Sequence, residues 1–240
     1  MIVSIAQPAY LPWLGYFDRI AKSDLHIVLD SVQMERNSKT SFTMRNRVRS
    51  AAGPVWLSVP VRRAAGADEA LIRNALIDGP HWARKHWQTL QQEYRRAPCY
   101  EFGRAALEPI YQQPWTRLND LLSASSARLL NALGITTPLR HSGDLGVASH
   151  KSQLVLDLCR AVGATRYLSG PFGRDYLDLP SFEHAGIEVV FHDYVHPVYA
   201  QVHGGFEPYL SVVDLLFNHG AASRDILLSV YPSAQTGTTP

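Results

Sequence analysis

Residues 7–16, QPAYLPWLGY, constrain the fold of this chain more than any other stretch. Pro8 and Pro12 fix φ and lack a backbone N–H, so neither a strand nor a helix can continue through them. The apolar run before them, over 1–6, predicts a β-strand buried on both faces. Gly15 permits a close backbone approach where a helix over about 16–22 should begin. The loop therefore lies at the carboxyl end of a first strand, where open α/β sheets bind ligands.

The rest of the chain adds strands and helices in a βαβ rhythm, which favours a parallel sheet. We expect strands over 25–29, 55–61, 136–142, 165–168 and 187–191. We expect helices over 153–162, 180–185 and 211–218, and further helices over 81–94, 100–111 and 115–133. The sequence thus predicts an α/β fold, a mostly parallel sheet with flanking helices in a Rossmann-like three-layer arrangement, with a helical insertion over about 77–133. It predicts one domain over 1–230 and a disordered tail over 231–240.

Composition excludes several classes of protein. The formal charge of +2 over 240 residues provides no field for binding a polyanion such as DNA. Two cysteines, Cys99 and Cys159, form no disulfide framework or zinc motif, and neither is placed for nucleophilic catalysis. No apolar run is long enough to span a bilayer, and the first residues lack the pattern of a signal peptide. We therefore expect a soluble cytoplasmic protein with no membrane partner.

Polar side chains follow several of the predicted strands. Asp30 and Gln33 end the second strand, so they should face the same crevice as the loop that carries Gln7, Tyr10 and Tyr16. Later in the chain, Arg45, Asn46 and Arg47 offer donors suited to a carboxylate or a phosphate. A solvated basic face is the simpler interpretation of these residues. Later candidates at loops after strands are Asp144, Lys151, Ser169, Gly170, Tyr176, His196, Tyr199 and Gln201.

Several sequence blocks together resemble one family, the WbqC-like proteins. The blocks are QPAYLPWLGYFDRI at 7–20, DSVQ at 30–33, RNRV at 45–48, WLSVPV at 56–61, SGDLG at 142–146, HKS at 150–152, ATRYLSGPFGRDYLD at 164–178, HPVYAQ at 196–201 and LSVVDLLFNHG at 210–220. The resemblance implies an enzyme of surface-polysaccharide (O-antigen) or natural-product biosynthesis that transfers an acyl or aminoacyl group to an amine. Ser31 departs from the pattern, which would have a second acidic residue there.

Transfer onto an amine needs a base for the attacking nitrogen and donors for the developing oxyanion. His196 is the predicted base, because its ordinary pKa lies near neutrality. Tyr199, Gln201 and the backbone of 169–170 are the predicted oxyanion donors. Lys151 or the Arg45–Arg47 pair would hold a carboxylate or phosphate, and Asp30 would bind the amine or orient the histidine. The implied partners are an amine or amino-sugar acceptor and an acyl- or aminoacyl-carrier thioester or aminoacyl-tRNA donor.

Three alternatives remain open at this point. The strand, loop and helix at the start resemble HxGH-type nucleotidyltransferases, whose loop and helix terminus hold phosphates, although the two histidines of that motif are absent. His192, His196 and His203 raise the possibility of metal-assisted hydrolysis, but their spacing fits no strong zinc motif. The third alternative is a binding module without catalysis. The sequence identifies no cofactor.

Overall fold

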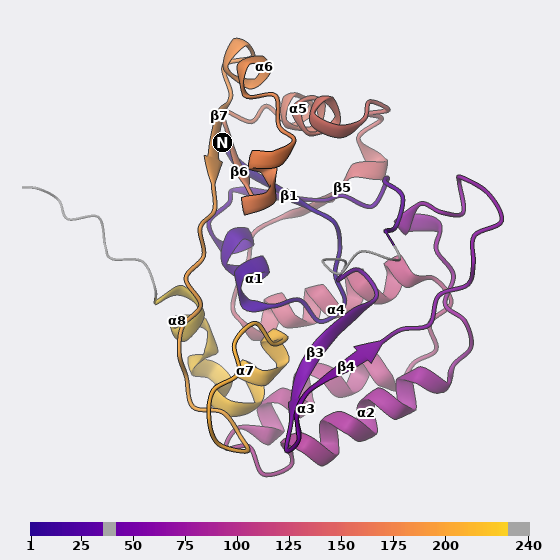
Figure 1. Cartoon of the computed structure of the whole chain (residues 1–240), viewed down its shortest axis with the longest axis vertical. Coiled ribbons are helices and arrows are strands. Elements are labelled where there is room, and N and C mark those ends of the chain that lie inside the picture. The colour runs from indigo at the N-terminus through magenta and orange to yellow at the C-terminus, as the bar shows by residue number, and fades with distance from the viewer. Residues whose placement is uncertain (36–41, 230–240) are drawn as a thin grey trace, which may run out of the picture.

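The computed structural model describes residues 1–35 and 42–229, and its centre is a five-stranded parallel sheet. The strands occur in the order β5-β2-β1-β6-β7, and every neighbouring pair is parallel. Figure 1 shows β1 between the labelled strands β5 and β6. Their bounds are Ile2–Ala6 (β1), Leu25–Val28 (β2), Leu139–His141 (β5), Arg166–Ser169 (β6) and Glu188–Phe191 (β7). The α/β fold with a parallel sheet predicted from the sequence is confirmed.

Helices cover both faces of this sheet. They are α1 (Leu14–Ala21), α2 (His81–Tyr94), α3 (Tyr100–Tyr111), α4 (Leu118–Ala132), α5 (Lys151–Ala161), α6 (Leu179–His184), α7 (Val212–His219) and α8 (Ser223–Leu228). Val3 and Ile5 of β1 point to a core with α5 and α6, which includes Leu158 and Phe182. The larger core contains Phe17 of α1 together with α2, α3, α4 and α7. Since side chains alternate along a strand, apolar residues on both faces require this three-layer arrangement.

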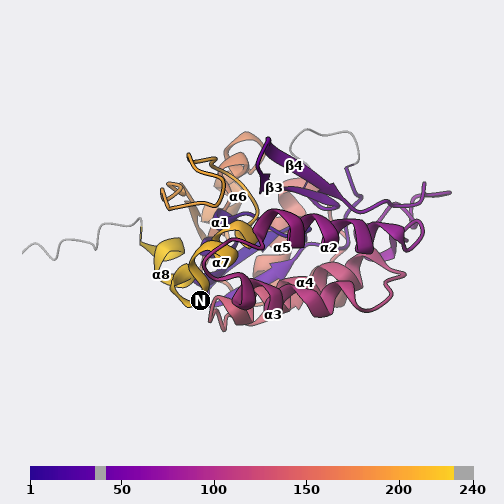
Figure 2. The ribbon, with the colours of Figure 1, turned by 90° about the horizontal axis from the view of Figure 1, so that it is seen from below.

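The strand expected over 55–61 does not join the parallel sheet. It is β4, Gly53–Ser58, and it pairs antiparallel with β3, Arg45–Ser50, in a separate hairpin. Val48 and Leu57 are its buried apolar side chains and belong to the larger core, while the arginines of β3 alternate with its buried positions. Figure 2 shows the hairpin lying over α2, apart from the sheet.

Helices α2, α3 and α4 follow one another between β4 and β5. The ring of Phe217 on α7 stacks on Tyr94 at the end of α2, with 4.6 Å between centroids, and this contact joins α7 to that layer. Gly103 of α3 leaves room for the same ring, because a Cβ there would approach Phe217 to 2.3 Å. The predicted tail over 231–240 lies outside the described residues. Within the part of the chain that is described, no helix combines the length and apolar character needed to cross a membrane.

Candidate functional site

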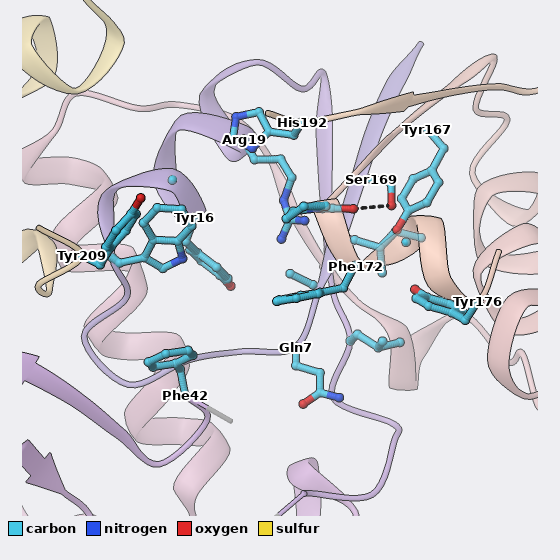
Figure 3. Close-up of a pocket in the computed structure, with 18 of the residues that line it drawn as sticks. Gln7, Tyr16, Arg19, Phe42, Tyr167, Ser169, Phe172, Tyr176, His192 and Tyr209 are labelled. Atoms are coloured by element: carbon cyan, nitrogen blue, oxygen red, sulfur yellow. Dashed lines mark hydrogen bonds between the residues drawn. The ribbon is translucent and has the colours of Figure 1, made fainter. Parts of the chain in front are cut away.

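The order in which strands are added to the sheet changes direction at β1. Strands β2 and β5 are added on one side of β1, and β6 and β7 on the other. Such a switch point opens a crevice at the carboxyl ends of the two central strands, which is where α/β proteins bind ligands. A pocket of about 460 Å³ lies at this position (Figure 3). Its described lining residues are Ile5, Ala6, Gln7, Trp13, Gly15, Tyr16, Arg19, Leu29, Phe42, Arg47, Tyr167, Ser169, Gly170, Pro171, Phe172, Gly173, Tyr176, His192 and Tyr209.

Aromatic rings form a large part of the pocket wall, and its charge is positive. Seven of these lining residues are tryptophan, tyrosine or phenylalanine, and two are arginines, Arg19 and Arg47. None of the described lining residues is an aspartate or glutamate. Flat apolar walls with fixed guanidinium groups suit a ligand that combines a ring with a carboxylate or phosphate.

A buried carboxylate holds one histidine at the pocket wall. His192 directly follows β7, and its backbone N–H donates to the carbonyl of Ser169 at the end of β6 (2.8 Å). Its Nε2 lies 2.6 Å from Oδ2 of Asp18, which is fully buried on α1 and also accepts from Lys22 (2.8 Å). Because an ionised carboxylate only accepts, Nε2 is the nitrogen that donates to Asp18, and Nδ1 is the ring nitrogen left to accept. The other oxygen of Asp18 is buried and has no partner among the described residues.

Arg19, the next residue of α1, supplies the central cation of the pocket. Figure 3 shows its guanidinium between His192 and Phe172. Its Nε is buried and has no hydrogen-bond partner in the described part of the chain. Gly170 makes room for this side chain, because a Cβ there would lie 2.4 Å from Nη1 of Arg19. Two consecutive residues of α1 therefore act at the pocket. Asp18 holds the ring of His192, and Arg19 supplies the cation.

Six predicted site residues line this pocket: Gln7, Tyr16, Arg47, Ser169, Gly170 and Tyr176. Burial raises the pKa of Tyr16 to about 12, against a smaller lowering by Arg19. The hydroxyl of Ser169 donates to the carbonyl of Gly170 at 3.0 Å, as Figure 3 shows. The amino-terminal loop and the loop after β6 thus meet at one cavity.

Asp30 lies away from the pocket lining, in a network at the ends of β2 and β5. Its two oxygens accept from His141 (2.7 Å), the hydroxyl of Ser142 (3.1 Å), the backbone of Gly143 (3.0 Å) and Asn119 (3.2 Å). Burial raises the pKa of Asp30, but these hydrogen bonds outweigh it and lower the pKa below its usual value. The bond to Asp30 raises the pKa of His141.

The predicted residues His196, Tyr199 and Gln201 lie behind the pocket wall. His196 contacts Tyr209, a lining residue, with 5.3 Å between ring centroids, but does not itself line the cavity. Burial lowers the pKa of His196 and raises that of Tyr199. Gln201 binds the backbone of Glu207 through both ends of its amide (2.9 and 2.8 Å). These residues support the wall of the pocket and do not line the cavity.

The remaining predicted residues have other positions. Tyr10 is fully buried and bonds His86 (3.0 Å) and Tyr111 (2.8 Å). Asn46 is buried and donates to the carbonyl of Leu11 at 2.6 Å. Arg45 stacks over Trp56 on the hairpin, and three others lie at exposed positions outside the pocket lining: Gln33, Asp144 and Lys151.

Sequence reasoning missed Asp18 and Arg19, and it considered His192 only for metal-assisted hydrolysis. The signal for Asp18 was a charged residue on the apolar stripe of α1, four positions after Leu14 and next to Phe17. The signal for His192 was its place directly after a strand. Among the described residues, no group of three or more His, Cys, Asp or Glu side chains is arranged to hold a metal ion.

Together the fold and the pocket define an α/β protein with a cationic, aromatic pocket at the switch point of its sheet. The chain belongs to the WbqC-like protein family, whose model matches residues 7–226. It is 40% identical over 230 residues to the uncharacterized protein Rv1507c of Mycobacterium tuberculosis, an alignment that covers 94% of this chain and 96% of that protein. No solved structure matches the chain. The resemblance read from the sequence is thereby confirmed.

Proposed function

We propose that the chain is a transferase that moves an acyl or aminoacyl group from an activated donor to an amine, with His192 as the general base. The observation that carries this proposal is the Asp18–His192 pair at the pocket wall, with 2.6 Å between Nε2 and Oδ2. A carboxylate that fixes the ring leaves Nδ1 to take a proton from the attacking nitrogen. His192 takes the role for which the sequence suggested His196.

Arg19, the pocket cation, meets the second requirement of the reaction, which is stabilisation of the developing oxyanion. As the amine nitrogen bonds to the acyl carbon, the carbonyl oxygen gains negative charge, which Arg19 would stabilise. The proton from nitrogen passes to Nδ1 of His192. The bond to the leaving group then breaks, and the leaving thiolate or phosphate departs with the electron pair. Each of these side chains lines the same pocket.

Asp30 and the Tyr199 region fit a supporting role in this scheme. Asp30 has four donors already, so it has little capacity for a substrate ammonium. The proposed acceptor is an amine or amino sugar. The proposed donor is an activated acyl or aminoacyl compound.

The test is transfer measured by mass spectrometry on the purified chain, with a panel of amino sugars and acyl or aminoacyl donors. We expect His192→Asn to lower kcat/KM by roughly 10²- to 10⁴-fold, the usual contribution of a positioned base. His184→Asn, at an exposed position on α6, is the matched control and should leave the rate unchanged. A fully active His192→Asn variant contradicts the proposal.

One observation favours nucleotidyl transfer as a second candidate. The strand order and the loop before α1 fit the HxGH-type layout, and Arg19 supplies a cation where that motif's histidines are missing. This reaction would release pyrophosphate from a nucleoside triphosphate. A coupled pyrophosphate assay with ATP and Mg²⁺ separates it from acyl transfer, because acyl transfer from a preformed donor releases none.

A further inference from the structure

The β3–β4 hairpin carries a stack of guanidinium groups and one aromatic ring beside the pocket. Arg45 and Arg47 lie two residues apart, so they point to the same face of β3, and Trp56 is the cross-strand partner of Arg47. Their guanidinium carbons lie 4.7 and 5.8 Å from the Trp56 ring centroid. Trp56 as a residue nevertheless remains 44% exposed, so it presents surface to solvent beside these contacts.

This stack is continuous with the pocket. Phe42 stacks on Trp56, with 6.2 Å between centroids and 24° between ring planes, and Phe42 also lines the cavity. Figure 3 shows Phe42 on the side of Tyr16 and Tyr209. Arg47 likewise belongs both to the hairpin stack and to the pocket wall. A ligand that lies on Trp56 can therefore extend directly into the cavity.

The charges along this path favour a polyanionic linker. Arg47 stands at the hairpin side of the cavity and Arg19 at its centre, with no carboxylate among the described lining residues. The acidic group closest to Arg47 in the described structure is Glu207, at 3.8 Å, which is longer than a hydrogen bond. A phosphate offers Arg47 shorter, charge-assisted hydrogen bonds than this carboxylate does.

We propose that the hairpin is the nucleotide subsite for a nucleoside-diphosphate ligand. The base stacks on Trp56, the two phosphates lie between Arg47 and Arg19, and the group attached to them reaches His192. This deepens the proposed function and rests on it, because the attached group is then the amine or the acyl group that takes part in transfer. The same chemistry has two sources: a nucleotide-linked amino sugar as acceptor, or an adenosine-containing activated compound as donor.

The test is calorimetric titration of the full chain with UDP and with ADP, each compared with its nucleoside. We expect at least one diphosphate to bind, and its nucleoside to bind more weakly because it lacks the phosphates. Trp56→Ala should weaken diphosphate binding about tenfold or more, the usual loss for one stacked base, while Trp56→Phe keeps a ring and should stay within about threefold. Arg47→Gln should weaken the diphosphate about tenfold and leave the nucleoside unchanged.

Arg160→Gln is the control for charge, since Arg160 is exposed on α5 and does not line the pocket; it should bind both diphosphates normally. Circular dichroism of each variant shows that it is folded. A preference for UDP assigns the subsite to an acceptor, and a preference for ADP assigns it to a donor. Absence of binding by both diphosphates at millimolar concentration, or native affinity in Trp56→Ala, overturns the proposal. Diphosphate binding that depends on Trp56 without any amine transfer would retain this subsite and reject the transferase assignment alone.

Discussion

Two aspartate–histidine pairs with buried carboxylates look alike in this molecule, yet only one of them lines the pocket. In Asp30–His141 the nitrogen–oxygen distance is 2.7 Å, and in Asp18–His192 it is 2.6 Å. Each pair also has a glycine beside an arginine. A Cβ on Gly143 would lie 2.8 Å from Nη1 of Arg73, and a Cβ on Gly170 would lie 2.4 Å from Nη1 of Arg19.

The pairs differ in how completely their carboxylates are satisfied. Asp30 accepts from four donors that reach both oxygens. Asp18 accepts from His192 and Lys22 through one oxygen, and its other oxygen has no partner among the described residues. Asp30, with hydrogen bonds to both oxygens, connects the ends of two strands. Asp18 instead orients the ring of His192 at the pocket, where that ring is available for chemistry. Pairing alone therefore does not identify a catalytic site.

The largest expected difference between the pairs is in activity. His192→Asn should lower transfer by roughly 10²- to 10⁴-fold, whereas His141→Asn should change it less than about threefold, because His141 does not line the pocket. Parallel measurement of kcat/KM on both variants decides this. Equal losses would mean that the two histidines serve the reaction in the same way, and the comparison would fail.

The opposite order is expected for stability. Asp30→Asn removes the charge that several donors share, at a cost of about 3 kcal/mol in the free energy of unfolding. Asp18→Asn should cost about 1 kcal/mol, because an amide oxygen can still accept from His192. Urea denaturation of both variants at pH 7 gives the two values. A larger loss for Asp18→Asn would contradict the structural role assigned to Asp30.

The pH dependence of the Asp30–His141 pair gives a smaller effect with a defined sign. The pKa of Asp30 is lowered from 3.8, so its contribution is present above 3.8 and is lost as pH falls through its folded pKa. The pKa of His141 is raised from 6.5, so its contribution is present below 6.5 and is lost as pH rises through its folded pKa. Native protein should therefore exceed His141→Gln in stability by at most about 1 kcal/mol, with the difference largest between these values. Melting curves from pH 5 to 8.5 should show it shrinking as pH rises.

The two glycines give the smallest expected change in stability. Gly170→Ala should displace the end of the flexible Arg19 side chain at a cost below about 1 kcal/mol, yet raise KM because the pocket cation moves. Gly143→Ala meets Arg73 outside the pocket and should leave KM unchanged. Steady-state kinetics alongside melting temperatures separate the two results. Unchanged KM in Gly170→Ala would remove Arg19 from the site.

The sequence predicted the sheet well because β1, β2 and β7 lie in short apolar runs of the chain. It did not place β4 correctly, because strand-like residues do not reveal which partner a strand pairs with. The alternation of arginines with Asn46 and Val48 in β3 indicated a half-buried strand next to a turn at Gly53, but the arginines made the segment look like a solvated basic face.

The candidate site was predicted in part for a similar reason. Residues in conspicuous loops, such as Gln7 and Ser169, reach the pocket because loops at the carboxyl edge converge there. His192 and Asp18 lie 174 positions apart, so only the folded sheet brings them into contact. Asp30 and His196 stand in equally conspicuous motifs, yet the first lies in a network at the end of β2 and the second behind Tyr209.

Helix α1 has an implication for how this protein can vary. Asp18 and Arg19 are neighbours on a helix of eight residues, whose first turn is covered by the Trp13 ring at Gly15, where a Cβ would come within 2.3 Å of that ring. A shift of α1 would move Asp18 and Arg19 together. The position of neither side chain can therefore change without the other. Relatives that accept differently shaped substrates should therefore differ in the Phe172 loop or the hairpin. They should keep the contact between Trp13 and Gly15 that positions this helix.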